Sequence, residues 1–459
     1  MRNRLATLLM LLIASVAFGA NTHIKGNIGQ QSFKSLQVKV VNDFLTNTHE
    51  KIAEINIDAN GNFSFDIEID RVTYVLLDFG KLKRHFYAEP NQNYEVGLGV
   101  VNPNLNAVNS VYEIDEQPAY LIGTDSTELN HLMIRLEADL ARYSLDHLND
   151  LLKTTPKKQL DALSDSLRNE YPLDHSEFFK TQFDYSIAAL YQFVYRRGKD
   201  LFQAAYFIEK PVHSDNPAYM KLFKMQFEKY FKMEYSKPER KYLLDYLNKN
   251  QYPELLESIY PLAGPQDKEL RELVLLHAIY ENWGNGRVNP KSVEYHLAKL
   301  IETTASETNK LTATNIQRKL MELAPGSDAP DFALYDLDSN LFMLSALRGK
   351  YVYLNFTESW SKNFDLDSRV MMSWKTKLPE LEVVSVMVDT DEDLVKAYLE
   401  KERPNWTVLY AGQNPAILLD YKLSTYPIYF LIGPDGKIIL SPAKTPYEGF
   451  ENQFKSITQ

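Results

Sequence analysis

Residues 351–364 read YVYLNFTESWSKNF, and this stretch decides the fold of the last third of the chain. Its first six residues are apolar apart from one asparagine, which predicts a buried strand. Strand and helix then alternate, which predicts an α/β fold whose mainly parallel sheet has helices on both faces. The other predicted strands cover residues 381–388, 428–432 and 437–440, and the predicted helices cover residues 391–403 and 414–423.

Five short motifs around this stretch resemble a known family. GSDAPDFAL (326–334) and LSALRGKYV (344–352) resemble the opening of TlpA/ResA-type, AhpC/TSA-like thioredoxin-like domains. FTESW (356–360) lies where these proteins carry the strand that leads into their redox motif. YPIYFLI (426–432) and DGKI (435–438) resemble their cis-proline strand and closing hairpin.

The resemblance covers residues 326–459, and its motifs occur in the order that the family has. It implies a thioredoxin-like fold with a cis peptide bond between Tyr426 and Pro427. It also implies a protein of the type found in the cell envelope of Bacteroidota.

The sequence departs from that family at the residues that carry its chemistry. None of the 459 residues is a cysteine, and Ser361 and Phe364 occupy the two positions of the Trp-Cys-x-x-Cys motif. The thiolate is the nucleophile of disulfide exchange, and neither a hydroxyl nor a phenyl ring replaces it. The peroxidatic thiolate of a peroxiredoxin is absent as well. We therefore expect neither disulfide oxidoreductase nor peroxidase activity.

Ser361 is a candidate nucleophile only if a base lies beside it. All nine histidines lie at or before residue 296, outside this part of the chain, and no Gly-x-Ser-x-Gly elbow is present. Glu358 could act as a base, but a lone glutamate of this kind is usually solvated. We interpret Ser361 as the N-cap of the helix that follows it.

The resemblance implies a binding role in place of redox catalysis. In that family the backbone beside the cis-proline pairs with an extended peptide, which is a form of strand addition. Phe364 in place of a cysteine would make the groove more apolar, although simple filling of the core is an equal alternative. The residues that would line this degenerate groove are Trp360, Ser361, Lys362, Phe364, Tyr426 and Pro427.

Two functions remain open from the sequence. The first is a redox-inactive binding or scaffold protein that recognises a peptide or protein partner in the cell envelope through the degenerate groove. The alternative is an enzyme with a non-thiol active site outside the thioredoxin-like domain, where we find no recognisable catalytic set.

The first 20 residues predict a cleaved signal peptide. Arg2 and Arg4 precede an apolar run over residues 5–18, and residues 17–20 supply the small side chains that signal peptidase needs. The run is shorter than the roughly 20 residues that a bilayer requires. No cysteine follows it for lipid attachment. We expect a periplasmic or secreted protein, cleaved after Gly19 or Ala20, with no transmembrane segment in the mature chain.

Charge and motif spacing argue against several classes of ligand. The formal net charge of −11 disfavours nucleic acid and anionic lipid as partners. The histidines lack zinc-site spacing, and residues 389–393 lack the spaced ligands of a calcium loop. No glycine-rich phosphate loop is present. We therefore predict no metal and no cofactor.

The chain upstream divides into two further regions. Residues 21–102 contain seven short alternating runs separated by turn signals, which predict an antiparallel β-sandwich. Residues 103–323 contain apolar residues near a period of 3.6 with prolines between the runs, which predict an irregular helical domain. With the signal peptide at 1–20 and the thioredoxin-like domain at 324–459, the chain is predicted to be multidomain.

Overall fold

The computed structural model describes most of the chain after residue 19. The described ranges are 20–29, 33–80, 82–99, 115–153, 156–195, 198–231, 242–259, 267–282, 288–336, 340–389, 391–411, 415–423 and 426–458. The predicted signal peptide lies outside these ranges except for its last residue. Contacts divide the chain into a first unit (1–42, 49–154 and 158–184) and a second unit (43–48, 155–157 and 185–459).

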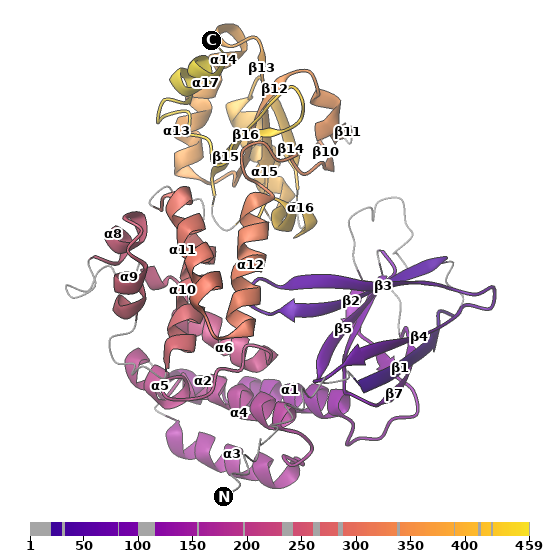
Figure 1. The fold of residues 1–459 in the computed structure, drawn as a ribbon. Helices are drawn as coiled ribbons and strands as arrows, with labels where there is room; N and C mark the ends of the chain where they lie inside the picture. Colours follow the sequence, from indigo (N-terminus) through magenta and orange to yellow (C-terminus); the bar gives the residue numbers. More distant parts are fainter. Residues whose placement is uncertain are drawn as a thin grey trace, which may run out of the picture. The chain divides into compact units, whose positions relative to one another are not determined.

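The first unit contains two β-sheets (Figure 1). One has the strand order β4-β1-β7-β9 and the other the order β3-β2-β5-β6-β8. The strands are β1 Ala20–Asn27, β2 Ser35–Asp43, β3 Thr48–Asn56, β4 Asn62–Ile69, β5 Thr73–Asp78, β6 Leu82–Ala88, β7 Asn93–Gly97, β8 Asp115–Pro118 and β9 Tyr120–Leu121.

Alternation of side chains makes these two sheets a sandwich. Along β4, Phe63, Phe65 and Ile67 are buried while the residues between them are exposed. The buried residues of both sheets form one apolar core, as the sequence predicted. The sandwich is not purely antiparallel, however, because β1 pairs with β7 and β6 pairs with β8 in parallel. It also extends past the predicted boundary at residue 102, to Leu121, because β8 and β9 belong to its sheets.

The central region is an irregular array of helices, as predicted. Asn216, Asn289 and Ser306 cap three of its helices by accepting hydrogen bonds from backbone amides of the first turn. The helices are α1 Leu129–Asp146, α2 Leu148–Lys153, α3 Lys157–Glu170, α4 Glu177–Tyr191, α5 Lys199–Tyr206, α6 Pro217–Phe227, α8 Leu243–Asn248, α9 Tyr252–Ser258, α10 Lys268–Asn282, α11 Pro290–Thr303 and α12 Glu307–Met321.

Residues 43–48, between β2 and β3, pack with the helices of the second unit. Leu45 is buried in the same apolar core as α6, α10 and α11. The carboxylate of Asp43 is buried and accepts hydrogen bonds from Thr312 Oγ1 at 3.1 Å and Asn315 Nδ2 at 3.3 Å, both on α12. These bonds satisfy a carboxylate whose burial would otherwise be costly.

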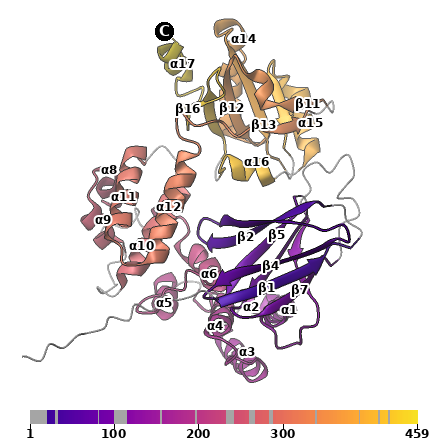
Figure 2. The same ribbon diagram turned by 45° about the vertical axis from the view of Figure 1, so that its right-hand side comes forward.

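The C-terminal part of the second unit is an α/β domain built on one five-stranded sheet (Figure 2). The strand order is β14-β13-β12-β15-β16. Its elements are β10 Ala333–Tyr335, β11 Leu341–Met343, the 3₁₀ turn η3 Leu344–Leu347, β12 Tyr351–Thr357, α13 Lys362–Met371, α14 Trp374–Lys377, β13 Leu381–Met387, α15 Glu392–Glu402, β14 Thr407–Tyr410, α16 Pro415–Asp420, β15 Ile428–Ile432, β16 Ile438–Leu440 and α17 Phe450–Thr458.

This sheet is covered on both faces, as predicted. On one face, buried residues of α13 and α17 pack with Tyr353 of β12 and Tyr429 of β15. On the other face, Tyr421 packs against Phe356 and Phe430 with ring centroids 4.8 and 5.3 Å away. The sheet is mixed rather than mainly parallel, because β12 to β14 are parallel and β15 and β16 are antiparallel to their neighbours.

A buried ion pair holds the late strand β8 in the sandwich. Arg84 on β6 is fully buried, and its guanidinium donates to the carboxylate of Asp115 on β8 at 3.2 and 3.3 Å. The same guanidinium donates to the backbone oxygens of Leu98 at 2.5 Å and Asp115 at 3.0 Å. The charge is therefore paired and hydrogen-bonded where no water reaches it, so removal of either partner leaves a buried charge.

We predict that Asp115→Ala destabilises the first unit by about 3–5 kcal/mol, since Arg84 then loses its carboxylate inside the protein. Urea unfolding and amide hydrogen exchange of β6 measure the loss. Glu95→Ala is the control, because it breaks an exposed pair with Lys25 (2.8 Å), and it should cost less than about 1 kcal/mol. Equal losses in the two variants would contradict the assigned role of the buried pair.

Burial shifts the pKa values of two titratable groups on α10 in the direction that favours their neutral forms. Burial lowers the pKa of His277 to about 4, and burial raises the pKa of Glu281 to about 7. His277 Nε2 lies 3.7 Å from Glu281 Oε1 and 3.3 Å from the carbonyl oxygen of Lys224. The second carboxyl oxygen of Glu281 accepts from the backbone amide of Lys229 at 2.9 Å.

The two groups make stability depend on pH in opposite directions. The unfolded chain protonates His277 near pH 6.5. The contribution of neutral His277 to the free energy of unfolding is therefore lost as pH falls from 6.5 to about 4. The folded chain keeps Glu281 protonated up to about pH 7, so the contribution of protonated Glu281 to the free energy of unfolding is lost as pH rises from 4.5 to about 7.

We therefore predict that in Glu281→Gln the effect of His277 on the free energy of unfolding is no longer opposed by that of Glu281. Between pH 4.5 and 6.5, where the two contributions of the wild type oppose each other, the free energy of unfolding of the variant should rise more steeply with pH. Urea unfolding followed by far-ultraviolet circular dichroism across this range checks it. The same pH profile for both proteins would show that Glu281 has the same pKa in the folded and unfolded chains.

Candidate functional site

The candidate site lies where β12 ends and α13 begins. β12 and β15 are antiparallel with Phe356 opposite Ile428. Thr357 and Glu358 therefore continue toward Pro427 and Tyr426, which precede β15. The peptide bond between Tyr426 and Pro427 is cis, which confirms the expectation from the family resemblance.

Ser361 is the N-cap of α13, as the sequence predicted. Its backbone is extended, with φ −69° and ψ 113°, and its hydroxyl oxygen accepts a hydrogen bond from the Phe364 amide at 3.4 Å. This is the capping arrangement that satisfies an otherwise unpaired amide of the first turn. No histidine lies in the thioredoxin-like domain to activate the hydroxyl. The structure thus gives Ser361 a structural role.

Phe364 does not line a groove, so that part of the predicted site is wrong. Its side chain is 0% exposed and belongs to the core cluster beneath α13. Its ring centroid lies 6.0 Å from that of Tyr398 on α15. The position faces inward because it shares one face of α13 with Asp367 and Met371, three and seven residues later, which are also buried. Filling of the core, the alternative left open by the sequence, is the one observed.

The other predicted residues lie at the surface. Trp360 is 67% exposed, and Lys362 in the first turn of α13 is also exposed. Tyr426 and Pro427 are half-buried. The structure therefore presents an exposed indole just before α13 and a half-buried Tyr-Pro pair on the segment that precedes the neighbouring strand β15.

Two carboxyl groups that the sequence analysis did not assign to the site lie beside it. Asp389 is buried and accepts hydrogen bonds from the Ser359 amide at 2.9 Å and the Ser359 hydroxyl at 2.6 Å. Burial, with Asp389 nearby, raises the pKa of Glu358. Burial, with Glu358 nearby, raises the pKa of Tyr426. The site is therefore acidic as well as aromatic.

The positions of these carboxyl groups could have been found from the strand pattern. Glu358 directly follows β12, and Asp389 follows β13, which is its parallel neighbour. The carboxyl ends of adjacent parallel strands meet at one edge of a sheet, which is where ligands bind in open α/β folds. From the sequence, Glu358 was expected to be solvated and Asp389 was considered only as part of an acidic run without calcium-loop spacing, because the strand order was not known.

A third carboxyl group connects α13 to neighbouring elements by hydrogen bonds. Asp367 is buried and accepts from the Tyr429 hydroxyl at 2.6 Å and the Tyr447 amide at 3.0 Å. Burial raises the pKa of Asp367. These bonds connect α13 to β15 and to the loop before α17. They position the helix whose first turn carries the candidate site.

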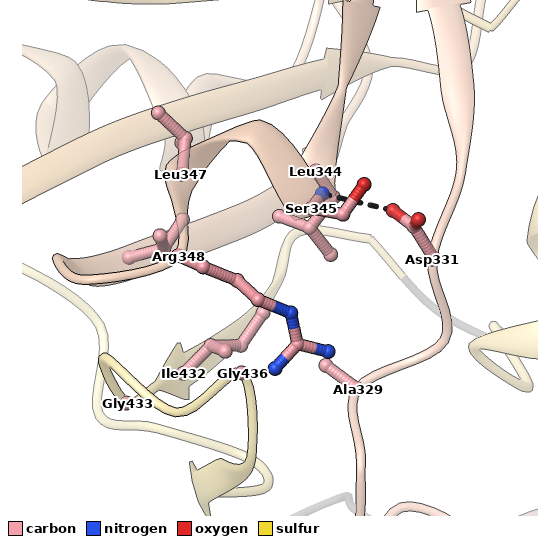
Figure 3. Close-up of a pocket in the computed structure, with 10 residues that line it drawn as sticks. Ala329, Asp331, Leu344, Ser345, Leu347, Arg348, Ile432, Gly433 and Gly436 are labelled. Atoms are coloured by element: carbon pink, nitrogen blue, oxygen red, sulfur yellow. Dashed lines mark hydrogen bonds between the residues drawn. The ribbon is translucent and has the colours of Figure 1, made fainter.

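The small cavity in Figure 3 is not a ligand site. It has a volume of ≈ 20 Å³, which is room for about one water molecule. Asp331 accepts from the Ser345 amide at 2.9 Å, and the Arg348 guanidinium donates to the Asp435 carbonyl at its rim. The guanidinium points at Gly436, where a Cβ atom would lie 2.3 Å from it. These contacts close the hairpin and leave no space for a substrate.

Within the described residues, no three histidine, aspartate or glutamate side chains are grouped so as to hold a metal ion. In the same residues, none of the helices has the length and apolar character needed to span a bilayer.

Comparison with known proteins identifies the family of this domain. Residues 325–441 match the model of the AhpC/TSA family. The thiol-disulfide oxidoreductase ResA of Bacillus subtilis is 29% identical over 139 residues, which cover 29% of this chain and 76% of that protein. ResA of Geobacillus kaustophilus is 30% identical over 148 residues, which cover 31% of this chain and 84% of that protein.

Solved structures give similar matches over the same share of the chain. The thioredoxin domain of a thiol-disulfide oxidoreductase from Bacteroides vulgatus is 23% identical, with 29% of this chain and 99% of that chain covered and a TM-score of 0.27. A putative thiol:disulfide interchange protein from Chlorobium tepidum is 28% identical, with 30% and 96% covered and a TM-score of 0.26.

These relatives are named for thiol chemistry, which this chain cannot perform because it has no cysteine. Through its C-terminal domain, the chain belongs to the AhpC/TSA family of thioredoxin-like proteins, as a member without cysteine that is related to ResA.

Proposed function

We propose that the thioredoxin-like domain is a redox-inactive binding module that recognises an extended segment of a peptide or protein partner. The partner contacts Trp360, Tyr426 and Pro427, and Ser361 and Lys362 lie at the edge of the same surface. The observation that carries the proposal is the exposure of the indole of Trp360, which is 67% accessible two residues after Glu358, the neighbour of the half-buried Tyr426.

An exposed tryptophan of this kind favours contact with a partner. A tryptophan side chain can bury 150–250 Å², so covering the accessible part would contribute on the order of 3 kcal/mol. Tryptophan and tyrosine are enriched among the residues that dominate binding energies. The site has no thiol and no activated hydroxyl, so the role that we propose for it is non-covalent binding.

The charge beside the aromatic residues favours a partner with a basic side chain. Glu358 lies next to Tyr426, and Asp389 lies behind Ser359. A lysine or arginine of the bound segment would meet these carboxyl groups while its neighbour covers Trp360. Electrostatic complementarity of this kind sets specificity and speeds association.

The proposed setting is the cell envelope. The basic, apolar and small residues of positions 1–20 support export to the periplasm or beyond. An exported protein of 459 residues without disulfides must be stabilised by its core, and each unit has an extended one. The partner would therefore be an envelope protein or a peptide derived from one.

We predict that a photo-crosslinking amino acid at position 360 captures basic, aromatic-containing peptides from a synthetic library. The same substitution at Leu394, which is 49% exposed on α15, is the matched control and should capture none. Trp360→Ala should weaken binding of a captured peptide about 10- to 100-fold, since hot-spot truncations cost roughly 2–3 kcal/mol.

Calorimetric titration of the captured peptide against wild type and Trp360→Ala measures that change. Ser361→Ala should leave peptide affinity within about twofold, because its hydroxyl is occupied by capping. Equal capture at positions 360 and 394 would count against the proposed surface. Loss of binding in Ser361→Ala alone would point to chemistry at the hydroxyl instead.

We also predict that the wild type neither reduces insulin disulfides nor consumes peroxide.

Ser361→Cys with Phe364→Cys should form a disulfide, because the two positions are three residues apart at the start of α13, within the Cα distance that a disulfide requires. The variant should lose about 3 kcal/mol of stability, since a buried phenyl ring is removed. Thiol titration and intact mass test closure, with Ser361→Cys alone as control. Free thiols after oxidation would show that the motif has lost its geometry.

A further inference from the structure

Three polar side chains form a hydrogen-bonded chain on the exposed face of the first unit's smaller sheet. The Ser64 hydroxyl lies 3.2 Å from His23 Nε2. On the other side of the ring, His23 Nδ1 lies 2.8 Å from Asp66 Oδ1. With the proton on Nδ1, the ring donates to the carboxylate and accepts from the hydroxyl. This is the order of contacts in a serine nucleophile, its base and the group that orients the base.

Strand register brings these residues together from two distant segments. β1 and β4 are antiparallel, with His23 opposite Asp66 and Lys25 opposite Ser64. Side chains alternate between faces, so Ser64 and Asp66 point to the same face as His23 while Phe63 and Phe65 enter the core. Figure 2 shows β1 and β4 side by side. Because the strands belong to a rigid sandwich, the geometry does not depend on a loop.

A hollow of ≈ 480 Å³ opens beside Ser64. Its other walls are mainly polar and carry both signs of charge, with Lys25, Asn56, Asp58 and Glu95 among the lining residues. Ile122, which is 44% exposed, adds an apolar side. This volume is within the range of small-molecule sites, and the amide and charged groups of the lining offer hydrogen-bond partners to a ligand that carries several hydroxyl groups.

We propose that Ser64, His23 and Asp66 form an acyl-transfer site that hydrolyses a short-chain acyl ester of a polyhydroxylated alcohol. Ser64 is the nucleophile, His23 the general base and acid, and Asp66 the positioning residue that holds the His23 ring. The site lies wholly in the first unit, so it is independent of the binding surface proposed for the thioredoxin-like domain.

The reaction needs only the ester and water. Ser64 Oγ attacks the ester carbonyl carbon while its proton passes to His23 Nε2, and the C–O bond to the alcohol breaks as the alcohol takes that proton. Water then loses a proton to His23 Nε2 and attacks the acyl carbon on Ser64. The ester bond to Ser64 breaks, the proton returns to Ser64 Oγ, and a carboxylic acid leaves.

The surroundings of the site limit its rate. Lys25 lies opposite Ser64 in the register and supplies a positive charge for the oxygen that becomes negative. Lys25 is also paired with Glu95 at 2.8 Å, and the side chains of His23 and Asp66 are 40% and 56% exposed. Solvent therefore weakens the electrostatic contribution, and we expect slow turnover. Covalent trapping of Ser64 is for that reason the most sensitive readout.

The test uses the full chain and a fluorophosphonate probe, which loses fluoride to an activated serine. Peptide mass spectrometry should locate the adduct on Ser64. Ser64→Ala should abolish labelling, and His23→Gln should lower its rate about 100-fold or more, the usual contribution of a general base. Ser35→Ala is the matched control, since this serine lies next to Glu54 rather than a histidine, and it should label like the wild type.

A purely structural role for the three side chains predicts a different outcome. Cross-strand hydrogen bonds contribute roughly 0.2–1 kcal/mol to a sheet, so the variants would shift the melting temperature without any labelling to lose. Asp66→Asn distinguishes the catalytic role from the structural role. If Asp66 orients the base, this variant should be labelled more slowly while its melting temperature stays unchanged. Absence of an adduct on Ser64, or hydrolysis of 4-nitrophenyl acetate by Ser64→Ala at the wild-type rate, overturns the proposal.

Discussion

The burial of the Phe364 ring beneath the first turn of α13 is the constraint on which the degenerate site depends. The ring occupies core volume at a position where the family carries a sulfur atom, so the helix is held from below by packing. Ser361 is then left to cap the helix, and Trp360 lies outside it. The chemistry is lost because both Ser361 and Phe364 replace cysteines, while the scaffold is retained because each has a structural role, as cap and as core residue.

Buried polar groups support the scaffold in both units, and two of them are satisfied by partners from distant parts of the chain. Asp367 receives the Tyr429 hydroxyl and a loop amide, and Arg84 is enclosed by Asp115 and backbone oxygens. A buried charge is tolerated only where such partners are complete. In a chain without disulfides, these contacts fix the register of elements that apolar packing alone would leave less specific.

The sequence was sufficient where a local pattern decides the structure. The alternation in β4 predicts its buried face, and an asparagine or serine before a helical run predicts its cap. It was insufficient where tertiary partners decide. β8 contains Asp115 and Pro118 and falls in the region predicted to be helical, yet it pairs with β6, where the buried guanidinium of Arg84 holds Asp115. The inward direction of Phe364 and the approach of Glu358 to Tyr426 likewise depend on packing and strand order.

The contacts of Asp43 also bear on the order in which parts of the chain can fold. Its partners on α12 follow 269 and 272 residues later. At the 5–20 residues per second of protein synthesis, the interval is on the order of 10–50 s. For that time the nascent chain has only the local Leu45 amide and Thr46 hydroxyl to bond to this carboxylate, and it lacks the two α12 groups that complete the set of partners. Assembly around residues 43–48 is therefore a late event that must wait until most of the polypeptide exists, which leaves ample opportunity for a chaperone to hold the early strands.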